Sequence, residues 1–201
     1  MGTDGRKKLG ILTINVRGLN DRNKRLMVRE YLKSFKIDLV CMQETHISGD
    51  QISCLDDLGL RRLASTSQSG KVGGVAILTT NTTLIVHRIL ADKLGRWVIT
   101  ACEIASSQFT LCTVYASNSD YPEVIDSLKL KLVSWPLPII VCGDFNCHRQ
   151  CPCTISPLAV SRKPKVMSAI DRLQENHALC DVWSVLKPLD PGYTFFSHPH
   201  S

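Results

Sequence analysis

The 201-residue sequence lacks several features that mark particular classes of protein. It has no apolar run near the roughly 20 residues that a membrane-spanning helix needs, so we expect no membrane association. Its N-terminus shows no apolar stretch followed by a small-residue cleavage site, so secretion is not expected. A Gly-x-Ser-x-Gly nucleophile elbow and a Gly-Lys-Ser/Thr phosphate loop are both missing, so serine hydrolase and P-loop chemistry have no support.

The composition is that of one globular domain. Hydrophobic residues make up 44% of the chain and charged residues 21%, close to the average for folded proteins. The formal net charge of +6 favours polyanionic partners through long-range attraction, although many unrelated soluble proteins carry similar charge. The nine cysteines are an odd number, and several interrupt apolar strand-like runs, as buried reduced cysteines do. These cysteines, Cys41, Cys102, Cys112 and Cys142, indicate a reducing, intracellular compartment.

Apolar periodicity divides the chain into strands and helices. The order, strand, helix, strand, four consecutive strands, helix, strand and helix, predicts largely antiparallel sheets with helices packed outside. The four consecutive strands have short polar connections, which predict an antiparallel meander. The predicted strands are 9–15, 37–42, 73–78, 82–90, 97–104, 109–115 and 138–142; the helices are 21–35, 121–135 and 165–177, with 48–60 weakly helical and 179–201 irregular.

Two of the predicted helices carry an apolar stripe at helical spacing. Such a stripe faces the core in an amphipathic helix. The basic residues of the first helix, Arg22, Lys24, Arg25 and Arg29, are expected mostly to form a solvated face. The core-facing residues are expected to be Met27, Val28, Tyr31, Leu32 and Phe35 in the first helix and Val124, Leu128, Leu132 and Trp135 in the second.

Three apolar strands end abruptly in polar side chains. The first ends at Asn15, the second at Glu44, and a later one at Asp144 and Asn146. Each residue taken alone is an ordinary turn former, but together they indicate a site at one edge of a sheet. Carboxylate oxygens suit Mg²⁺ or Mn²⁺, and neutral amides hold a phosphate or a water without adding charge. The set therefore predicts metal-assisted hydrolysis of a phosphoester.

Six motifs occur in an order that matches a known family. The chain resembles the endonuclease/exonuclease/phosphatase superfamily, and within it most of all the apurinic-type endonuclease domain of LINE-type (non-LTR) retrotransposons. The likeness spans residues 9–201, which we take as the domain after a polar tail of residues 1–8. The motifs are Ile14-Asn15-Val16-Arg17-Gly18-Leu19, Met42-Gln43-Glu44-Thr45-His46, Gly73-Gly74-Val75-Ala76-Ile77-Leu78, Val114-Tyr115-Ala116, Gly143-Asp144-Phe145-Asn146 and Tyr193-Thr194-Phe195-Phe196-Ser197.

The resemblance implies a fold and a set of roles. The fold is an α+β, four-layer sandwich of two mostly antiparallel sheets with helices outside, incomplete at its C-terminal end. Glu44 is implied as the principal metal ligand with Asn15 beside it, and Asp144 as the carboxylate that positions and activates water. Asn146 would contact the phosphate and orient the attack, and Tyr115 would touch the scissile phosphate or the leaving group.

Two further residues are implied on the substrate side. Arg17 follows the first strand closely, so we expect it to contact the DNA backbone. Thr194 matches a position near the DNA-binding rim of the family. A β-branched strand residue is an equally good reading of Thr194, as a core aromatic is of Tyr115.

The family pattern continues past the end of this sequence. In the family, the last motif is followed by an Ile-Asp segment and then by Ser-Asp-His, which supply a further aspartate and a central catalytic histidine. Because the sequence stops at Ser201, we expect these 201 residues alone to be nearly inactive and less stable than a longer chain.

A cysteine-rich segment after Asn146 offers soft metal ligands. Cys147, His148, Cys151 and Cys153 lie close together, but their spacing does not fit a tetrahedral zinc site, so unligated loop thiols are the better interpretation.

The leading reading is a Mg²⁺-dependent DNA endonuclease of retrotransposon type that leaves a 3′-hydroxyl. It would be intracellular, nuclear when it acts on DNA, and without an obligate protein partner. An apurinic endonuclease or exonuclease III-like DNA repair enzyme is the nearest alternative. A phosphoinositide phosphatase or sphingomyelinase is disfavoured by the basic charge, and a non-catalytic nucleic-acid-binding remnant is the alternative of another class.

Overall fold

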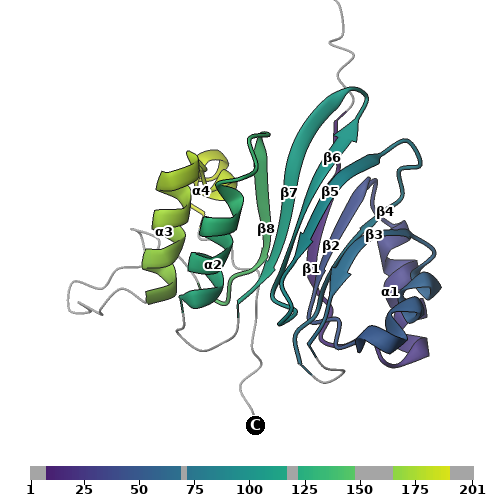
Figure 1. The fold of residues 1–201 in the computed structure, drawn as a ribbon. Helices are drawn as coiled ribbons and strands as arrows, with labels where there is room; N and C mark the ends of the chain where they lie inside the picture. Colours follow the sequence, from purple (N-terminus) through teal and green to yellow (C-terminus); the bar gives the residue numbers. More distant parts are fainter. Residues whose placement is uncertain (1–7, 69–71, 117–121, 148–164, 191–201) are drawn as a thin grey trace, which may run out of the picture.

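Two four-stranded sheets pack face to face, and helices cover their outer faces (Figure 1). The structure is a computed structural model and describes residues 8–68, 72–116, 122–147 and 165–190. It confirms the predicted α+β sandwich of four layers, with helix, sheet, sheet and helix following one another across the molecule. Within the described ranges, no helix is long and apolar enough to cross a membrane.

The first sheet mixes parallel and antiparallel pairs. Its order is β1-β2-β4-β3, with β1 and β2 parallel and β4 antiparallel to both of its neighbours. The two central strands are buried along their whole length, as expected for continuous apolar runs covered on both faces. The strands are β1 Ile11–Asn15, β2 Leu39–Gln43, β3 Arg61–Thr66 and β4 Val75–Thr79.

The second sheet is a three-stranded meander with one added parallel strand. Its order is β5-β6-β7-β8, and β8 runs parallel to β7 because α2 connects the two. β8 is an edge strand, as β1 is in the first sheet, and these two strands lie against one another. The strands are β5 Ile85–Ala91, β6 Trp97–Ile104, β7 Ser107–Tyr115 and β8 Ile139–Asp144.

The sequence analysis predicted a meander of four strands, but only three of them, β5, β6 and β7, form it. Segment 73–78 became β4, which pairs with β2 and β3 in the first sheet and not with β5. β3 was not predicted, nor was the short helix α4, Val182–Leu186. Sequential strands usually pair, but a strand with a continuous apolar run, as in Val75–Leu78, gains more between two other strands than at an edge.

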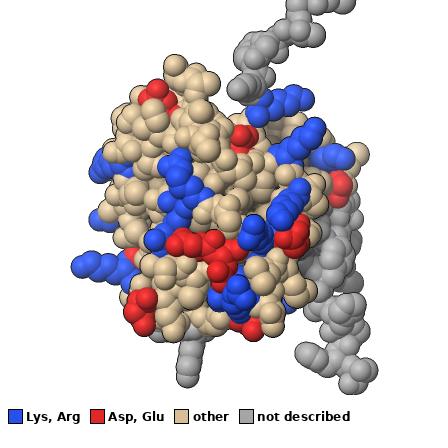
Figure 2. Space-filling view, turned by 90° about the vertical axis from the view of Figure 1, so that its right-hand side faces the viewer, with Lys and Arg blue, Asp and Glu red and all other residues tan. Residues whose placement is uncertain are grey.

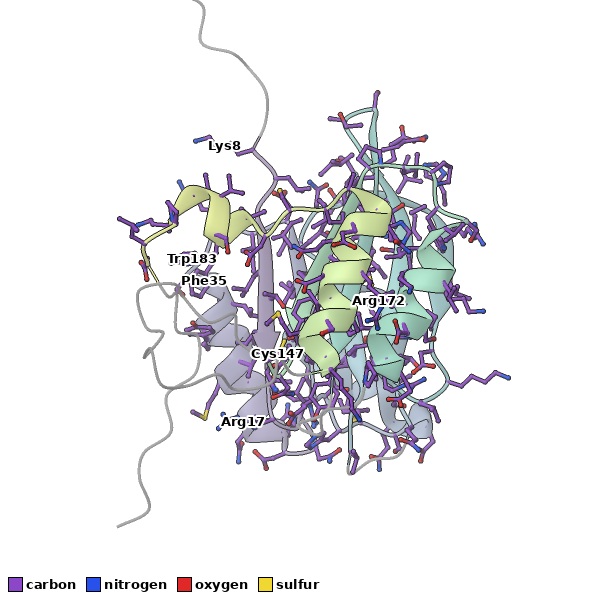
Figure 3. All side chains as sticks on the ribbon, turned by 90° about the vertical axis from the view of Figure 1, so that its left-hand side faces the viewer. Lys8, Arg17, Phe35, Cys147, Arg172 and Trp183 are labelled. Atoms are coloured by element: carbon purple, nitrogen blue, oxygen red, sulfur yellow. The ribbon has the colours of Figure 1, made fainter. Side chains whose placement is uncertain are left out.

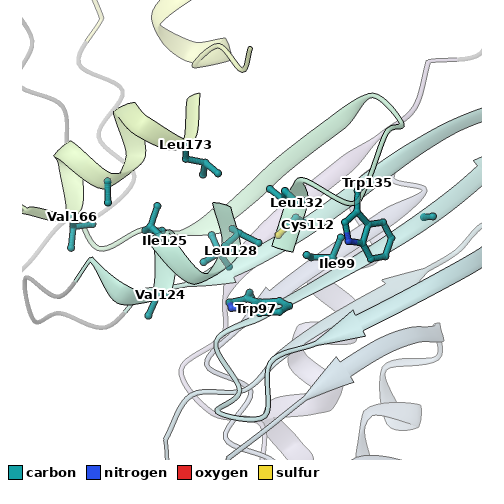
Figure 4. Close-up of a cluster of buried hydrophobic side chains, with 13 residues drawn as sticks. Trp97, Ile99, Cys112, Val124, Ile125, Leu128, Leu132, Trp135, Val166 and Leu173 are labelled. Atoms are coloured by element: carbon teal, nitrogen blue, oxygen red, sulfur yellow. The ribbon is translucent and has the colours of Figure 1, made fainter. Parts of the chain in front are cut away.

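Helices α2 and α3 cover the second sheet. They span Glu123–Leu132 and Lys165–His177, and the stripe predicted for α2 is confirmed. Val124, Leu128, Leu132 and Trp135 are all buried against the sheet (Figure 4). Figure 4 also shows Val166 and Leu173 of α3 beside this cluster, so the two helices share one core with β6 and β7.

Helix α1, Arg22–Lys33, and the 3-10 helix η1, Gly49–Leu58, cover the first sheet. The predicted α1 face is only partly right. Leu32 is buried and Val28 is partly buried, but the other three apolar residues are exposed: Met27, Tyr31 and Phe35.

Arg25 takes the place that an apolar residue was expected to hold on α1. It is buried, with one guanidinium nitrogen donating to the carbonyl oxygens of Leu19 and Asn20 at 2.7 and 2.8 Å. Its Nε donates to the Asp57 carboxylate at 3.0 Å. The expectation of a solvated face is therefore wrong for Arg25, which joins α1, its preceding loop and η1.

Thiols and polar side chains share the layer between the sheets. Cys41 and Cys102 are buried in this layer and Cys142 is half-buried there, and none of them forms a disulfide. Cys112, also without a disulfide, is buried on the opposite face of the second sheet against α2 and α3, and burial raises the pKa of its thiol. This agrees with the prediction of reduced, buried cysteines. The buried Gln43 amide donates across the layer to the Thr113 hydroxyl at 2.8 Å, which links β2 to β7.

Candidate active site

The polar strand ends predicted from the sequence meet at one end of the molecule. β1 and β2 are parallel neighbours, so Asn15 and the Gln43–Glu44 step emerge at the same edge of the first sheet. β8 ends at Asp144 beside β1, because the edge strands of the two sheets lie together. We call the group formed by Asn15, Glu44, Asp144, Tyr115 and Asn146 the rim site.

Asn15 holds the two carboxylates together. Its amide nitrogen donates to Glu44 Oε1 at 2.9 Å and to Asp144 Oδ2 at 2.7 Å. Its amide oxygen accepts from the backbone N–H of Arg17 at 3.0 Å. This set of partners fixes the orientation of the amide, because only an NH₂ group can donate to two carboxylates.

Tyr115 stands beside Asp144 on the neighbouring strand. The two residues are register partners in the parallel pair of β7 and β8. Burial, and then the charge of Glu44, a hydrogen bond to Glu44 and the charge of Asp144, raise the pKa of Tyr115 to about 12. The phenol therefore keeps its proton at neutral pH and remains a hydrogen-bond donor directed at the carboxylates.

Asn146 closes the loop that follows β8. Its backbone N–H donates to Asp144 Oδ1 at 3.0 Å, an Asx-type turn that fixes the second carboxylate oxygen. Its side-chain amide donates to the carbonyl oxygen of Ala116, the residue after Tyr115. Asn146 itself is exposed at the edge of the site.

The backbone around the rim site is strained. Arg17, Glu44, His46 and Asn146 all have positive φ, at 47°, 53°, 55° and 46°. Such conformations cost about 1–3 kcal/mol each in a residue with a Cβ, and they persist where the surrounding structure enforces them. Four of the seven such residues among those described gather at this one edge, which is typical of a functional site.

Glycine permits the tight backbone packing behind Glu44. The N–H of Thr45 donates to Gly74 O and that of His46 to Gly73 O, both at 3.1 Å. Gly74 has φ +90°, and a Cβ there would lie 2.4 Å from Thr45 Oγ1. The Gly73-Gly74 motif therefore fixes the chain that carries Glu44, and any larger residue at position 74 would displace it.

His46 is a site residue to which the sequence analysis gave no role. Its Nε2 lies 3.6 Å from Glu44 Oε2, and its ring packs where a Cβ on Gly18 would meet Nδ1 at 3.1 Å. The ring is thus held between the Arg17-Gly18 turn and Glu44. Its position two residues after Glu44 was the only signal available, because residues two apart share a face in an extended chain. The positive φ of both residues, which is not an extended conformation, could not be predicted from that spacing.

The other predicted site residues fall partly outside the described residues. Arg17 is exposed at the end of the molecule opposite Lys8 (Figure 3), directly after the β1 strand end. Cys147 lies beside the core cluster of the second sheet. Thr194 and the remaining members of the cysteine-rich segment, His148, Cys151 and Cys153, lie outside the described ranges.

The donor set of the rim site fits a hard divalent cation. Glu44 lies beside the Asn15 amide and, at 3.6 Å, the His46 ring, and Asp144 accepts from the Asn15 amide and the Asn146 N–H. The described residues form no group of three or more His, Cys, Asp or Glu side chains able to hold a metal. The two carboxylates suit Mg²⁺, which keeps several water or phosphate oxygens in its shell, and the Asn15 NH₂ group holds them together.

The surface charge does not concentrate on the α1 side. Figure 2 shows acidic side chains lying between basic ones on the side where α1 lies. The positive net charge of the sequence therefore does not form one continuous basic surface on that side of the molecule.

Solved structures with a similar fold include nucleases and related enzymes. An AP endonuclease from Archaeoglobus fulgidus is 21% identical, with a TM-score of 0.70 over 95% of this chain and 79% of that one. The human nocturnin catalytic domain with bound sulfate is 17% identical, with a TM-score of 0.52 over 70% of this chain and 65% of that one. A humanized D. rerio TDP2 is 18% identical, with a TM-score of 0.53 over 70% and 67%. At these identities the likeness shows the fold.

The family is shown by the sequence itself. A sequence model of the endonuclease/exonuclease/phosphatase family matches residues 12–200, nearly the whole chain and all the strands that carry the rim site. The chain belongs to the endonuclease/exonuclease/phosphatase family, whose members are phosphodiesterases and nucleases.

Proposed function

We propose that the rim site hydrolyses a phosphodiester bond of DNA with the help of a divalent cation, as an endonuclease of retrotransposon type. The observation that carries the proposal is the bridge from Asn15 to both Glu44 and Asp144, at 2.9 and 2.7 Å. One amide thereby gathers two carboxylates that come from different sheets. Folding alone gains little from placing two like charges on one amide, whereas a site for a cation and a phosphate requires it.

The residues present divide the chemistry between them. Glu44, with Asp144 beside it, would hold Mg²⁺ or Mn²⁺, which when bound neutralises charge on the phosphate oxygens. Asp144 accepts a hydrogen bond from the attacking water and orients it toward phosphorus. As the water oxygen bonds to phosphorus, its proton passes to Asp144 and the bond from phosphorus to the 3′ oxygen breaks. The departing 3′ oxygen takes a proton from solvent, which leaves a 3′-hydroxyl and a 5′-phosphate.

Asn146 and Tyr115 act on the phosphate side. Asn146 is pinned by its hydrogen bonds to Asp144 and Ala116, so its amide can orient a phosphate without adding negative charge. The Tyr115 hydroxyl is protonated well above neutral pH and donates a hydrogen bond to the phosphate or the leaving oxygen. If Asn15 binds the metal, as we propose, its amide oxygen is the ligand atom. This oxygen also accepts a hydrogen bond from the backbone N–H of Arg17.

DNA is proposed as the substrate on the order of the six motifs and the net charge of +6. The motifs resemble most the endonuclease domain of LINE-type retrotransposons, which implies a nuclear site of action on chromosomal DNA. We propose that Arg17, which is exposed beside the strand end of Asn15, contacts the DNA backbone.

The test is nicking of supercoiled plasmid. It compares residues 1–201 with a longer version, called the extended protein, in which the Ile-Asp and Ser-Asp-His motifs implied by the resemblance are added after Ser201. We expect the extended protein to nick in Mg²⁺ and to stop in EDTA. Glu44→Ala and Asp144→Ala should each reduce nicking by at least about 100-fold, the usual range for a lost acid–base or metal-linked group. Nicking retained in either variant would refute the assignment.

A second substrate distinguishes the proposed endonuclease from a repair-type enzyme and from a non-catalytic nucleic-acid-binding protein. A duplex carrying one abasic site is compared with an intact duplex of the same sequence. Cleavage confined to the abasic duplex would identify a repair-type apurinic endonuclease. Binding of both duplexes without cleavage of either, by the extended protein in Mg²⁺, would identify a non-catalytic nucleic-acid-binding protein.

A further inference from the structure

Resting on the proposed function, we propose that Gln43 is a positioning residue, whose side-chain amide fixes the two sheets against each other one step beneath the rim site. Gln43 is the last residue of β2 and comes directly before Glu44. It is only 1% exposed, so its amide cannot touch a substrate. It acts instead through the strands, because it joins the segment that carries Glu44 to the strand that carries Tyr115.

Two strands carry a threonine two residues before a member of the rim site. Thr13 precedes Asn15 on β1, and Thr113 precedes Tyr115 on β7. Residues two apart in a strand share a face, so both threonines lie one step beneath the rim site, on the faces that the two sheets turn toward each other. Gln43 therefore lies within reach of one hydroxyl group from each sheet.

The Gln43 amide forms hydrogen bonds with three strands. Its Nε2 donates to Thr113 Oγ1 on β7 at 2.8 Å, to Thr13 Oγ1 on β1 at 3.1 Å and to Cys41 O on its own strand at 3.0 Å. An NH₂ group has two hydrogens, so three acceptors around it leave no donor unused. The bond to Thr113 crosses from one sheet to the other and joins residues 70 apart in the sequence.

Packing alone does not require an amide at this position. Leu39, at the other end of β2, is fully buried in the core that the two sheets share, and it has no polar group. Apolar contacts have no preferred direction, whereas a satisfied network of buried hydrogen bonds rigidifies a core and specifies one arrangement. A catalytic site needs its groups held to within about 0.5 Å, which such a network can provide.

The path from this link to the rim site is short on both sides. Glu44 is the next residue on one side, and on the other side Tyr115 is two residues beyond Thr113 and pairs with Asp144. The Asn15 amide then spans Glu44 and Asp144 at 2.9 and 2.7 Å. A shift of one sheet against the other would therefore stretch the Asn15 bridge and separate the two carboxylates.

The test removes the bond between the sheets while nearly conserving side-chain volume. Gln43→Met deletes the donor, Thr113→Val deletes the acceptor, and Thr113→Ser keeps a hydroxyl group. Thr100→Val is the matched control. Thr100 and Thr113 are both fully buried threonines of the second sheet, but the Thr100 hydroxyl donates to Leu111 O within its own sheet.

Two measurements on residues 1–201 need no catalysis. Hydrogen exchange of the Asn15 side-chain NH₂, followed by NMR without metal, reports on the bridge. Binding of Mn²⁺, followed by the electron paramagnetic resonance of the free ion, reports on the carboxylates. In Gln43→Met and Thr113→Val we expect exchange about 10-fold faster and a Kd for Mn²⁺ that is about 10- to 100-fold higher. Both quantities should stay unchanged in Thr113→Ser and Thr100→Val.

Unchanged exchange and unchanged Mn²⁺ binding in folded Gln43→Met and Thr113→Val would overturn the proposal. An equal loss in Thr100→Val or Thr113→Ser would also overturn it, because any change in this layer would then disturb the site. Circular dichroism and urea denaturation check folding. If Gln43→Met does not fold, Thr113→Val decides, since it leaves the amide its two other acceptors. Unfolding of both variants beside a folded Thr100→Val would assign the bond to stability and reject a positioning role.

Failure of the proposed function gives a different pattern. If residues 1–201 bind no Mn²⁺ and the extended protein does not hydrolyse bis(p-nitrophenyl) phosphate, the hydrolase proposal fails, while the Asn15 exchange still tests Gln43. If the extended protein hydrolyses this diester, Gln43→Met should lower kcat about 10- to 100-fold with a smaller change in KM, because Gln43 does not touch the substrate. Equal kcat in the variant and the wild type would reject only the positioning role.

Discussion

Asn15 and Asp144 are 129 residues apart in the sequence, and a hydrogen bond of 2.7 Å joins the amide of one to the carboxylate of the other. The bond connects the edge strand of one sheet to the edge strand of the other. It therefore depends on the packing of the two sheets, and the rim site exists only when both are folded together. Its removal should affect function and stability at once.

Asn15→Ala should impair catalysis and folding together. Glu44 and Asp144 would lose their shared donor and repel each other without an intervening dipole. We expect activity of the extended protein on plasmid to fall roughly 10- to 100-fold, as for loss of a group that orients metal ligands. The free energy of unfolding should fall by about 1–3 kcal/mol, the cost of leaving partly buried acceptors without a partner. Urea denaturation and a nicking assay measure the two effects.

Asn23→Ala is the matched control, because Asn23 is exposed on α1. Asn23→Ala should leave the nicking activity and the free energy of unfolding unchanged. An Asn15→Ala protein with wild-type activity would show that the bridge is not needed to position the carboxylates.

Mg²⁺ should stabilise the wild-type chain through Glu44 and Asp144. A ligand that binds only the folded state raises the free energy of unfolding by about 2.7 kcal/mol at 100 times its Kd. We expect Tm to be higher in Mg²⁺ than in EDTA for residues 1–201, and this difference to disappear in Asp144→Asn and Glu44→Gln. Asp50→Asn, in an exposed position of η1, should keep it. The same shift in all four proteins would locate the cation elsewhere.

Tyr115 should titrate at unusually high pH for a tyrosine. Its pKa is raised to about 12, first by burial and then by Glu44 and Asp144. The folded pKa lies above the unfolded value of about 10, so the associated stability is complete below pH 10 and is lost as pH rises through 12. Absorbance at 295 nm should show a late component that Tyr115→Phe removes. Between about pH 10 and 12 the wild type should lose stability faster than this variant.

Glu44→Gln tests whether nearby negative charge contributes to the raised pKa of Tyr115. It removes one of the two charges that oppose ionisation of the phenol, so the late component should move to lower pH. A component that stays in place would leave burial and the Asp144 charge as the causes.

Local patterns predicted the parts of the fold that depend on neighbouring residues. The α2 stripe of Val124, Leu128, Leu132 and Trp135 was identified correctly because spacing alone determines one face of a helix. The polar strand ends Asn15, Glu44 and Asp144 were visible because each interrupts an apolar run. Their meeting at one edge followed from the parallel strands, whose carboxyl ends share an edge.

The sequence did not predict the features that depend on contacts between distant segments. The insertion of β4 between β2 and β3 depends on which strands compete for a neighbour, and no local pattern encodes that competition. The approach of His46 to Glu44 depends on a positive φ at both residues, which Gly73 and Gly74 enforce from a distant segment. Buried Arg25 was misplaced because its partners, Asp57 and two carbonyl groups, come from outside the helix.

Arg25→Ala should destabilise the first sheet without touching the rim site. Two carbonyl oxygens and the Asp57 carboxylate, 34% exposed, would lose their donor, and a cavity would open under α1. Loss of one partner of a buried pair costs about 3–5 kcal/mol. Arg22→Ala is the control: the Arg22 side chain is 73% exposed and lies 3.9 Å from the same carboxylate, so its loss should cost less than about 1 kcal/mol. Urea denaturation of the two variants measures the difference. Because Arg25 faces the interior, the salt dependence of DNA binding should be the same in Arg25→Ala as in the wild type where both are folded, whereas a reduced slope would mean that Arg25 reaches a phosphate.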